Sequence, residues 1–376
     1  MPDISKYVTG KEAGTGELPK MDDSSIGTDT YAFKRFQTLL NNNIESGNTF
    51  STTVVSTYSL IYTVDFAYAG GVLDIDGSVH FSPLLAVRGQ KVNKLGTVST
   101  YSLIYTNGSG AHVGGVLAPN GDVHFPPYNS IVGQKVSALG VVSTYSLVYT
   151  TANAYNGGVV APNGDIHFIP GLAVRGQKIN SAGTVSTYTL AYTLTTAASY
   201  AGGVLAPNGD IHFIPSSAEV GQKISAAGVV STYSLAYTIA NAYAGGVLNS
   251  NGDIHFVPRN ARVGQKIDIN GTVSTYSLAY TTTTAYSGGV LAANGDIHLF
   301  PRSAAVGQKI DKTGTVSTYS LVYTTSTGEA YISGILNANG IVHLIPYRGN
   351  RGQQYQLLNA EEHSLAVCQS PFFNKF

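Results

Sequence analysis

Aspartate and histidine recur two residues apart along this chain, a spacing that lets a carboxylate orient a histidine as a metal ligand or a general base. Examples are Asp165 with His167 and Asp210 with His212. Residues two apart on a strand lie on the same face, so the two side chains of a pair are expected to be adjacent. The histidine itself occurs seven times, at His80, His124, His167, His212, His255, His298 and His343.

The number of copies weighs against chemistry at these pairs. Catalysis requires one asymmetric site, and seven equivalent copies offer no nucleophile, oxyanion hole or second carboxylate that is set apart from the rest. A structural pair is therefore favoured over a seven-fold metal or anion ring, and both are favoured over catalysis. We assign no catalytic, cofactor-binding or metal residue, expect no cofactor, and predict that the chain is not an enzyme.

A Gln-Lys step offers a second set of polar groups, which could present amide and ammonium donors to a glycan or a carboxylate. The glutamine occurs in all seven copies, whereas Gln354 replaces the lysine in the last. Because glutamine both donates and accepts, a hydrogen bond to the backbone of a neighbouring unit is the favoured role. Tyrosines such as Tyr145 and Tyr149 are expected to pack between units with their phenol tips in water.

These residues belong to one unit of 43 to 45 residues that is repeated seven times. Nine residues separate the second glycine of a Gly-Gly pair from the histidine, and a proline follows three residues later. A Gly-Gln pair and a Thr-Tyr-(Ser/Thr)-Leu run come next. The Gly-Gly pair stands at Gly70-Gly71, Gly114-Gly115, Gly157-Gly158, Gly202-Gly203, Gly245-Gly246 and Gly288-Gly289, and Ser333-Gly334 replaces it in the last unit.

Each unit is predicted to form four strands. Gly-Gly-Val-Leu-Ala is the first, and Asn-Gly, as at Asn120-Gly121, favours a two-residue hairpin with both residues at φ > 0. Asp-Ile-His-Phe-Ile-Pro, Gly-Gln-Lys-Ile and a long Val-Ser-Thr-Tyr-Ser-Leu-Ala-Tyr-Thr strand follow, and Tyr233, Leu235 and Tyr237 share one face of the last. Four strands in some forty residues are typical of a propeller blade. We predict an all-β, seven-bladed β-propeller, favoured over a solenoid or separate modules, with the Gly-Gly strand innermost.

Length varies between units only in the segment before each Gly-Gly pair, which places these loops on one open rim. That rim is the expected recognition surface, and neutral drift in loops that tolerate change is the alternative. The Thr-Tyr-Ser-Leu strand has an additional copy at each end, at Thr57–Leu60 and in degraded form at Glu362–Leu365. Either copy could close the ring by completing a blade.

Composition excludes several classes of function. Lys+Arg and Asp+Glu are both 21, so the chain has no basic surplus for nucleic-acid phosphates. A single cysteine, Cys368, excludes an internal disulfide framework. The sequence predicts neither a signal peptide nor a membrane span.

Residues 1–50 do not match the repeat and are predicted to form an anchoring arm, followed by the propeller at 51–376. Within the arm, Phe33, Phe36 and Leu39 recur at helical spacing. We predict a short amphipathic helix over Tyr31–Leu40. Ten residues do not form a stable helix alone, so its apolar stripe is expected to pack on the propeller or on another molecule.

The whole unit, Gly-Gly-Val-Leu-Ala-Pro-Asn-Gly-Asp-Ile-His-Phe-Ile-Pro, then Gly-Gln-Lys-Ile, then Gly-Thr-Val-Ser-Thr-Tyr-Ser-Leu, resembles tandem-repeat β-propeller proteins of bacteriophages and other viruses. The resemblance implies a structural or attachment protein of a virus particle, located on a head or tail. Other virion proteins, bound through residues 1–50, and a host-surface glycan would be its partners. The alternative is a multivalent lectin-like propeller with seven similar pockets between blades.

Overall fold

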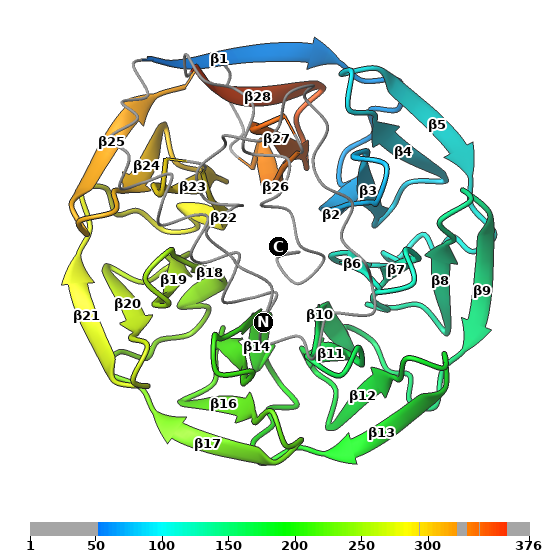
Figure 1. Ribbon diagram of the computed structural model, residues 1–376, viewed down its shortest axis with the longest axis horizontal. Coiled ribbons are helices and arrows are strands. Elements are labelled where there is room, and N and C mark those ends of the chain that lie inside the picture. The colour runs from blue at the N-terminus through cyan, green and yellow to red at the C-terminus, as the bar shows by residue number, and fades with distance from the viewer. Residues whose placement is uncertain (1–51, 293, 322–328, 338, 359–376) are drawn as a thin grey trace, which may run out of the picture.

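The computed structural model describes residues 52–292, 294–321, 329–337 and 339–358. Seven four-stranded antiparallel sheets are arranged as blades around a central axis (Figure 1). The predicted seven-bladed, all-β propeller is confirmed. The helix expected over Tyr31–Leu40 and the rest of the anchoring arm lie outside the described residues.

The strands follow one another from the inner to the outer edge of each blade. Blade 1 comprises β2 (Tyr68–Leu73), β3 (Val79–Pro83), β4 (Arg88–Val92) and β5 (Val98–Ser102). Blade 2 comprises β6 (Val116–Leu117), β7 (Val123–Phe125), β8 (Val132–Val136) and β9 (Val142–Ser146). Blade 3 comprises β10 (Tyr155–Val160), β11 (Ile166–Pro170), β12 (Arg175–Ile179) and β13 (Val185–Thr189). Blade 4 comprises β14 (Tyr200–Leu205), β15 (Ile211–Pro215), β16 (Val220–Ile224) and β17 (Val230–Ser234).

The remaining blades repeat this order. Blade 5 comprises β18 (Tyr243–Leu248), β19 (Ile254–Pro258), β20 (Val263–Ile267) and β21 (Val273–Ser277). Blade 6 comprises β22 (Tyr286–Leu291), β23 (Ile297–Pro301), β24 (Val306–Ile310) and β25 (Val316–Ser320). Blade 7 comprises β26 (Tyr331–Leu336), β27 (Ile341–Pro346) and β28 (Arg351–Leu358), and β1 (Thr52–Ser59) completes it.

The N-terminal strand closes the ring. β1 pairs with β28 in antiparallel register from Thr52 opposite Leu358 to Ser59 opposite Arg351. Blade 7 therefore holds three strands from one end of the described chain and one from the other. The competing copy of this strand, Glu362–Leu365, lies outside the described residues.

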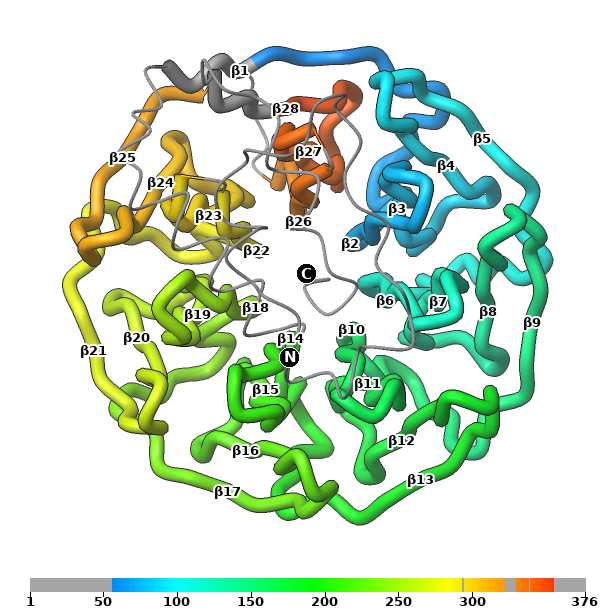
Figure 2. The backbone as a smooth tube through the Cα atoms, viewed as in Figure 1, coloured from blue at the N-terminus to red at the C-terminus, as the bar shows by residue number. Residues whose placement is uncertain are grey.

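The Gly-Gly strands line the axis, as predicted (Figure 2). Gly70 has φ +100°, and a Cβ added to it would lie 2.8 Å from Cα of Gly114, which precedes the inner strand of the next blade. A side chain at this position would separate two neighbouring blades. The glycines thus allow the inner strands to approach closely around the axis.

The first turn of each blade differs from the expected two-residue hairpin. In blade 2 the amide of Gly121 donates to the carbonyl of Ala118 at 2.9 Å, and Gly121 has φ +84°. Asn120 is not among the described residues with positive φ. Pro119 presets the φ of a type I turn, and the glycine then takes the left-handed position that ends it. The turn is therefore one residue longer than the Asn-Gly pair indicated.

The core lies between blades. Tyr233, Leu235 and Tyr237 of blade 4 pack against a cluster that contains Tyr243 and Phe256 of blade 5, so the predicted alternation is confirmed. The strand is shorter than predicted and ends at Ser234. The backbone leaves the ladder there because the following amides bond to a glutamine of the next blade.

This glutamine bond joins successive blades, as the sequence indicated. The Oε1 atom of Gln222 accepts hydrogen bonds of 2.8 Å from the amides of Ala191 and Tyr192, which follow the outer strand of blade 3. Equivalent pairs of bonds are made by the fully buried side chains of Gln90, Gln134, Gln177, Gln265 and Gln308.

We expect Gln222→Ala to lower the free energy of unfolding by about 2–6 kcal/mol, because two amides lose their acceptor at about 1–3 kcal/mol each. Urea denaturation followed by circular dichroism measures this loss. Gln354→Ala, at the position where other blades carry lysine, is the control and should cost under about 1 kcal/mol. Equal losses in the two variants would contradict the role assigned to Gln222.

The glycine before each of these glutamines provides space for an aromatic ring. A Cβ on Gly221 would lie 2.1 Å from the ring of Tyr233, its partner across the strand pair. The same contact recurs in every blade, at Gly89, Gly133, Gly176, Gly221, Gly264, Gly307 and Gly352.

Gly221→Ala should therefore displace the ring of Tyr233 and lower the free energy of unfolding by about 1–3 kcal/mol, the usual cost of overpacking. Chemical denaturation measures the difference. Gly108→Ala is the matched control, since nothing lies within 4 Å of a Cβ at that position. A neutral effect at Gly221 would show that the ring moves aside freely.

Candidate functional site

The aspartate of each predicted Asp-His pair binds lysine instead. Nζ of Lys178 lies 2.6 Å from Asp165, and the equivalent distance from Lys223 to Asp210 is 2.7 Å. Asp165 directly precedes β11, and its ion pair with Lys178 takes the place of a direct bond to His167, although its charge still acts on the pKa of that histidine. The lysine of the Gln-Lys step was considered as a donor to a glycan or a carboxylate. In these blades it forms an ion pair with aspartate instead.

The histidine faces a tyrosine of the outer strand. Nδ1 of His167 lies 3.3 Å from the hydroxyl of Tyr188, and His124 is related to Tyr145 by the same distance. The hydroxyl of Tyr145 is therefore not a wet tip, and burial raises its pKa. Only blade 1 shows a close Asp-His contact among the described ion pairs, at 2.9 Å between His80 and Asp74, which replaces the usual alanine.

Burial keeps His124 and His167 neutral. Desolvation lowers the pKa of His124 and His167 to about 4, and the nearby lysines add to the effect. In the described part of the chain, no group of three or more His, Cys, Asp or Glu side chains could hold a metal ion. The described ranges also contain no helix of the length and apolar character that a membrane span requires.

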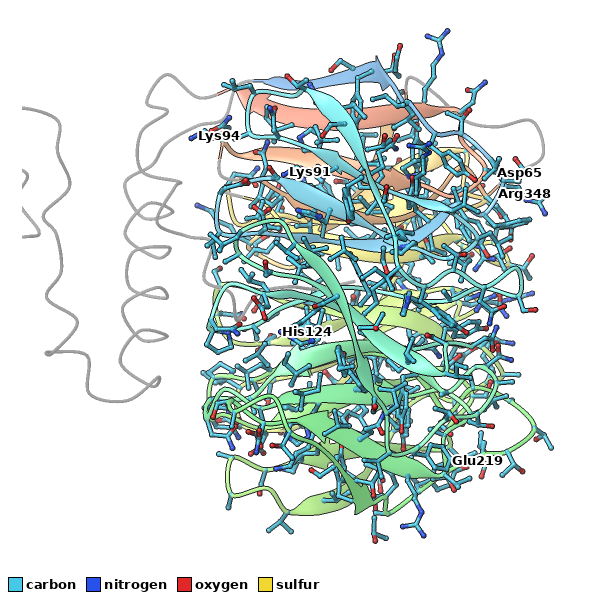
Figure 3. All side chains as sticks on the ribbon, turned by 90° about the vertical axis from the view of Figure 1, so that its right-hand side faces the viewer. Asp65, Lys91, Lys94, His124, Glu219 and Arg348 are labelled. Carbon is cyan, nitrogen blue, oxygen red and sulfur yellow. The ribbon has the colours of Figure 1, made fainter. Side chains whose placement is uncertain are left out.

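The two faces of the disc carry different connections. Loops between blades and loops between the second and third strands form one face, which we name the loop face, and the hairpin turns form the opposite turn face. Figure 3 shows Asp65, Glu219 and Arg348 on the loop face, with Lys94 on the turn face. The variable loops thus lie on one rim, as predicted.

A cavity of about 370 Å³ opens at the centre of the loop face. All seven blades line it through the second residue of the inner segment, which is Ala69, Val113, Asn156, Ala201, Ala244, Ser287 or Ile332. The residue after the repeated proline adds Tyr128, Ser216, Arg259 and Arg302. The framework around these two positions is repeated, but the positions themselves vary, so the cavity is asymmetric.

Sequence reasoning missed this cavity. It followed the residues that recur and the loops that change length, while the informative positions lie directly before the Gly-Gly pair and directly after the proline that ends the second strand. Aligning the seven units with one another would have found the signal: the post-proline residue is Leu84, Tyr128, Gly171, Ser216, Arg259, Arg302 or Tyr347.

One glutamate holds two arginines on the side of blades 6 and 7. Glu329 lies 2.6 Å from Arg302 and 3.4 Å from Arg348. Its backbone has φ +60°, and the equivalent residues Phe66, Asn153, Asn241 and Thr284 also have positive φ, so this conformation belongs to the repeated connection before the inner strand. Arg302 also lies over the ring of Tyr347, at 5.3 Å from its centroid.

The side chain of Arg259, from blade 5, has fewer hydrogen-bond partners than that of Arg302. Its buried Nε has no hydrogen-bond partner among the described residues. Burial and the neighbouring charge of Arg302 lower its pKa, yet a guanidinium remains charged at neutral pH. The arrangement combines a half-buried cation with hydroxyl and amide groups, which is suited to binding an anion.

The comparisons with solved structures place the fold among known propellers. A streptogramin B lyase matches with a TM-score of 0.70 and 20% identity, over 81% of this chain and 98% of that one. Virginiamycin B lyase from Staphylococcus aureus matches with a TM-score of 0.69 and 14% identity, over 82% and 100%. Hydrazine synthase from Kuenenia stuttgartiensis matches with a TM-score of 0.58 and 10% identity, over 80% and 98%. No protein-family model and no curated protein matches the chain.

These matches correct the prediction that the chain is not an enzyme. Two proteins of the same architecture are lyases, at 20% and 14% identity to this chain. Seven-fold repetition therefore does not exclude catalysis, because the variable positions of otherwise equivalent blades can build one asymmetric site. At these identities the likeness establishes the shared fold alone.

Proposed function

We propose that the protein recognises a host-surface glycan through the central cavity of its loop face and serves as an attachment propeller of a virus particle. The observation that carries the proposal is the distribution of variation between blades. Lining positions such as Tyr128 and Arg259 vary on a framework that is otherwise repeated. A constant scaffold that presents a varied surface is typical of recognition folds.

The chemistry of the cavity supports glycan binding. Tyr128, Asn153, Asn241 and Ser216 bring phenol, amide and hydroxyl groups to its wall, and sugars are bound through such donors and acceptors. Its volume, about 370 Å³, is within the roughly 300–1,000 Å³ typical of small-molecule sites.

The virus particle enters the proposal through the resemblance of the repeat to viral propellers. Residues 1–50 alone lack the repeat, and we assign them the contact with other virion proteins. Deleting residues 1–50 should abolish incorporation into particles while the cooperative melting of the propeller is kept. Normal incorporation of the truncated protein would remove the anchoring role.

A glycan array tests the recognition function. The informative variant replaces Tyr128, Arg259 and Arg302 together by serine, the residue that blade 4 carries at Ser216. We name it the levelled variant. The wild-type protein should bind a restricted set of glycans and the levelled variant should bind none, although both melt cooperatively. Absence of binding by the wild type, or equal binding by both proteins, would contradict the proposal.

A lectin-like propeller with pockets between blades is the second candidate, and one observation favours it. A cavity of about 140 Å³ lies between blades 4 and 5 on the turn face, lined by His212, Lys223, Tyr233 and Asp268 among others. Nδ1 of His212 is buried there without a hydrogen-bond partner among the described residues. Glycan binding that survives in the levelled variant and falls by about one molecule per chain in His212→Gln would support this candidate instead.

A further inference from the structure

Positive charge exceeds negative charge around the central cavity. Arg259, Arg302 and Arg348 come from consecutive blades, and Glu329 forms the described ion pairs with two of them. One carboxylate shared by two guanidinium groups leaves one positive charge uncompensated. Arg259 adds a second.

The guanidinium of Arg259 has N–H groups available to bind a ligand. Among the described residues, no ion pair involves its guanidinium and its buried Nε has no hydrogen-bond partner. A buried donor left without a partner is unfavourable, and more so when it is charged. An acceptor that arrives from solution would remove this cost, so the site is prepared for a ligand.

The surroundings of Arg259 limit what that ligand can be. Arg302 lines the same cavity and lowers the pKa of Arg259 by repulsion, so an anion there is stabilised by both cations. The planar guanidinium presents paired N–H donors that match two oxygens of a carboxylate or a phosphate. On the other side, Val113 and Ile332 provide apolar wall for an uncharged ring face.

We propose that Arg259 binds the acidic group, carboxylate or phosphate, of a sugar held in the central cavity, with Arg302 as the second cation. This inference rests on the proposed function, because it names the class of glycan that the loop face recognises. Neutral glycans that fill the same volume leave Nε of Arg259 unpaired and bind more weakly.

Isothermal titration of the full chain with three sugars tests the proposal. Glucuronate and glucose 6-phosphate differ from glucose in the group at C6, so the comparison isolates the acidic group and separates its two sources. We expect at least one acidic sugar to bind about tenfold or more tightly than glucose, as a charge-assisted bidentate contact would provide. Arg259→Gln should abolish this preference.

Arg262→Gln is the matched control, since it removes the same charge from the same blade at an exposed position outside the cavity. This variant should keep the preference for the acidic sugar. The proposal is overturned if neither acidic sugar binds better than glucose, or if Arg262→Gln loses as much as Arg259→Gln. If Arg259→Gln still binds the glycans of the array and the levelled variant does not, the anion site fails while the recognition function stands.

Discussion

Lowering the pH from 7 to 5 is expected to destabilise this propeller by several kcal/mol, far more than an average domain of its size. The cause is the set of buried neutral histidines. Burial lowers the pKa of the repeated residues His124, His167, His212, His298 and His343 to about 4, against an ordinary value near 6.5.

The sign follows from proton linkage. Between pH 6.5 and 4 the unfolded chain binds protons that the folded chain excludes, so stability is complete above pH 6.5 and is lost as the pH falls towards 4. Each such histidine contributes on the order of 1–2 kcal/mol to the loss at pH 5. Urea denaturation at pH 7 and pH 5 measures it.

A variant with His124, His167 and His212 replaced by glutamine is the control, because glutamine does not titrate. It should be less stable than the wild type at pH 7 but lose less stability on going to pH 5. Equal losses in both proteins, or a wild type that is equally stable at the two pH values, would show that these histidines are not held neutral by the fold.

Removing the closing strand is expected to have the second large effect. Deleting residues 1–59 removes β1, which leaves β28 as an exposed edge and blade 7 with three strands. An unpaired edge of eight residues favours association between chains. We expect the melting temperature to fall by about 10 °C, at roughly 2–4 °C per kcal/mol lost in domains of 150–250 residues, together with aggregation.

Deleting residues 1–50 is the matched control, since it retains β1 and the bonds from Ile61 and Tyr62 to Gln90 of blade 1. That protein should melt like the full chain. A protein without residues 1–59 that melts equally well would mean that another segment closes the ring. Differential scanning calorimetry and size-exclusion chromatography distinguish these outcomes.

Most of the fold could be predicted from the repeat, because invariant spacing of Gly-Gly, histidine, proline and Gly-Gln defines four strands in each of seven units. The closing strand could not, since two copies of it occur and only the pairing of β1 with β28 decides between them. The partner of the aspartate in the Asp-His pairs could not be predicted from the two-residue spacing, because the lysine that binds Asp165, Lys178, comes from the next strand of the blade.

The central cavity could not be predicted from the repeat. Arg259 and Arg302 are separated by one whole unit in sequence, and only closure of the ring brings them to one cavity with Ala69 and Tyr128 of the first two blades. The missing hydrogen bond at Nε of Arg259 is likewise a property of packing. The variation at the post-proline position was visible in the sequence, but its convergence on the axis was not.

The stoichiometry of glycan binding tests the central claim most directly. Equilibrium dialysis of the full chain against the glycan that binds best on the array measures the number of molecules bound at saturation. A single cavity at the axis predicts one glycan per chain, with binding lost in the levelled variant. About seven glycans per chain, bound equally by the levelled variant, would contradict the account and place recognition between the blades.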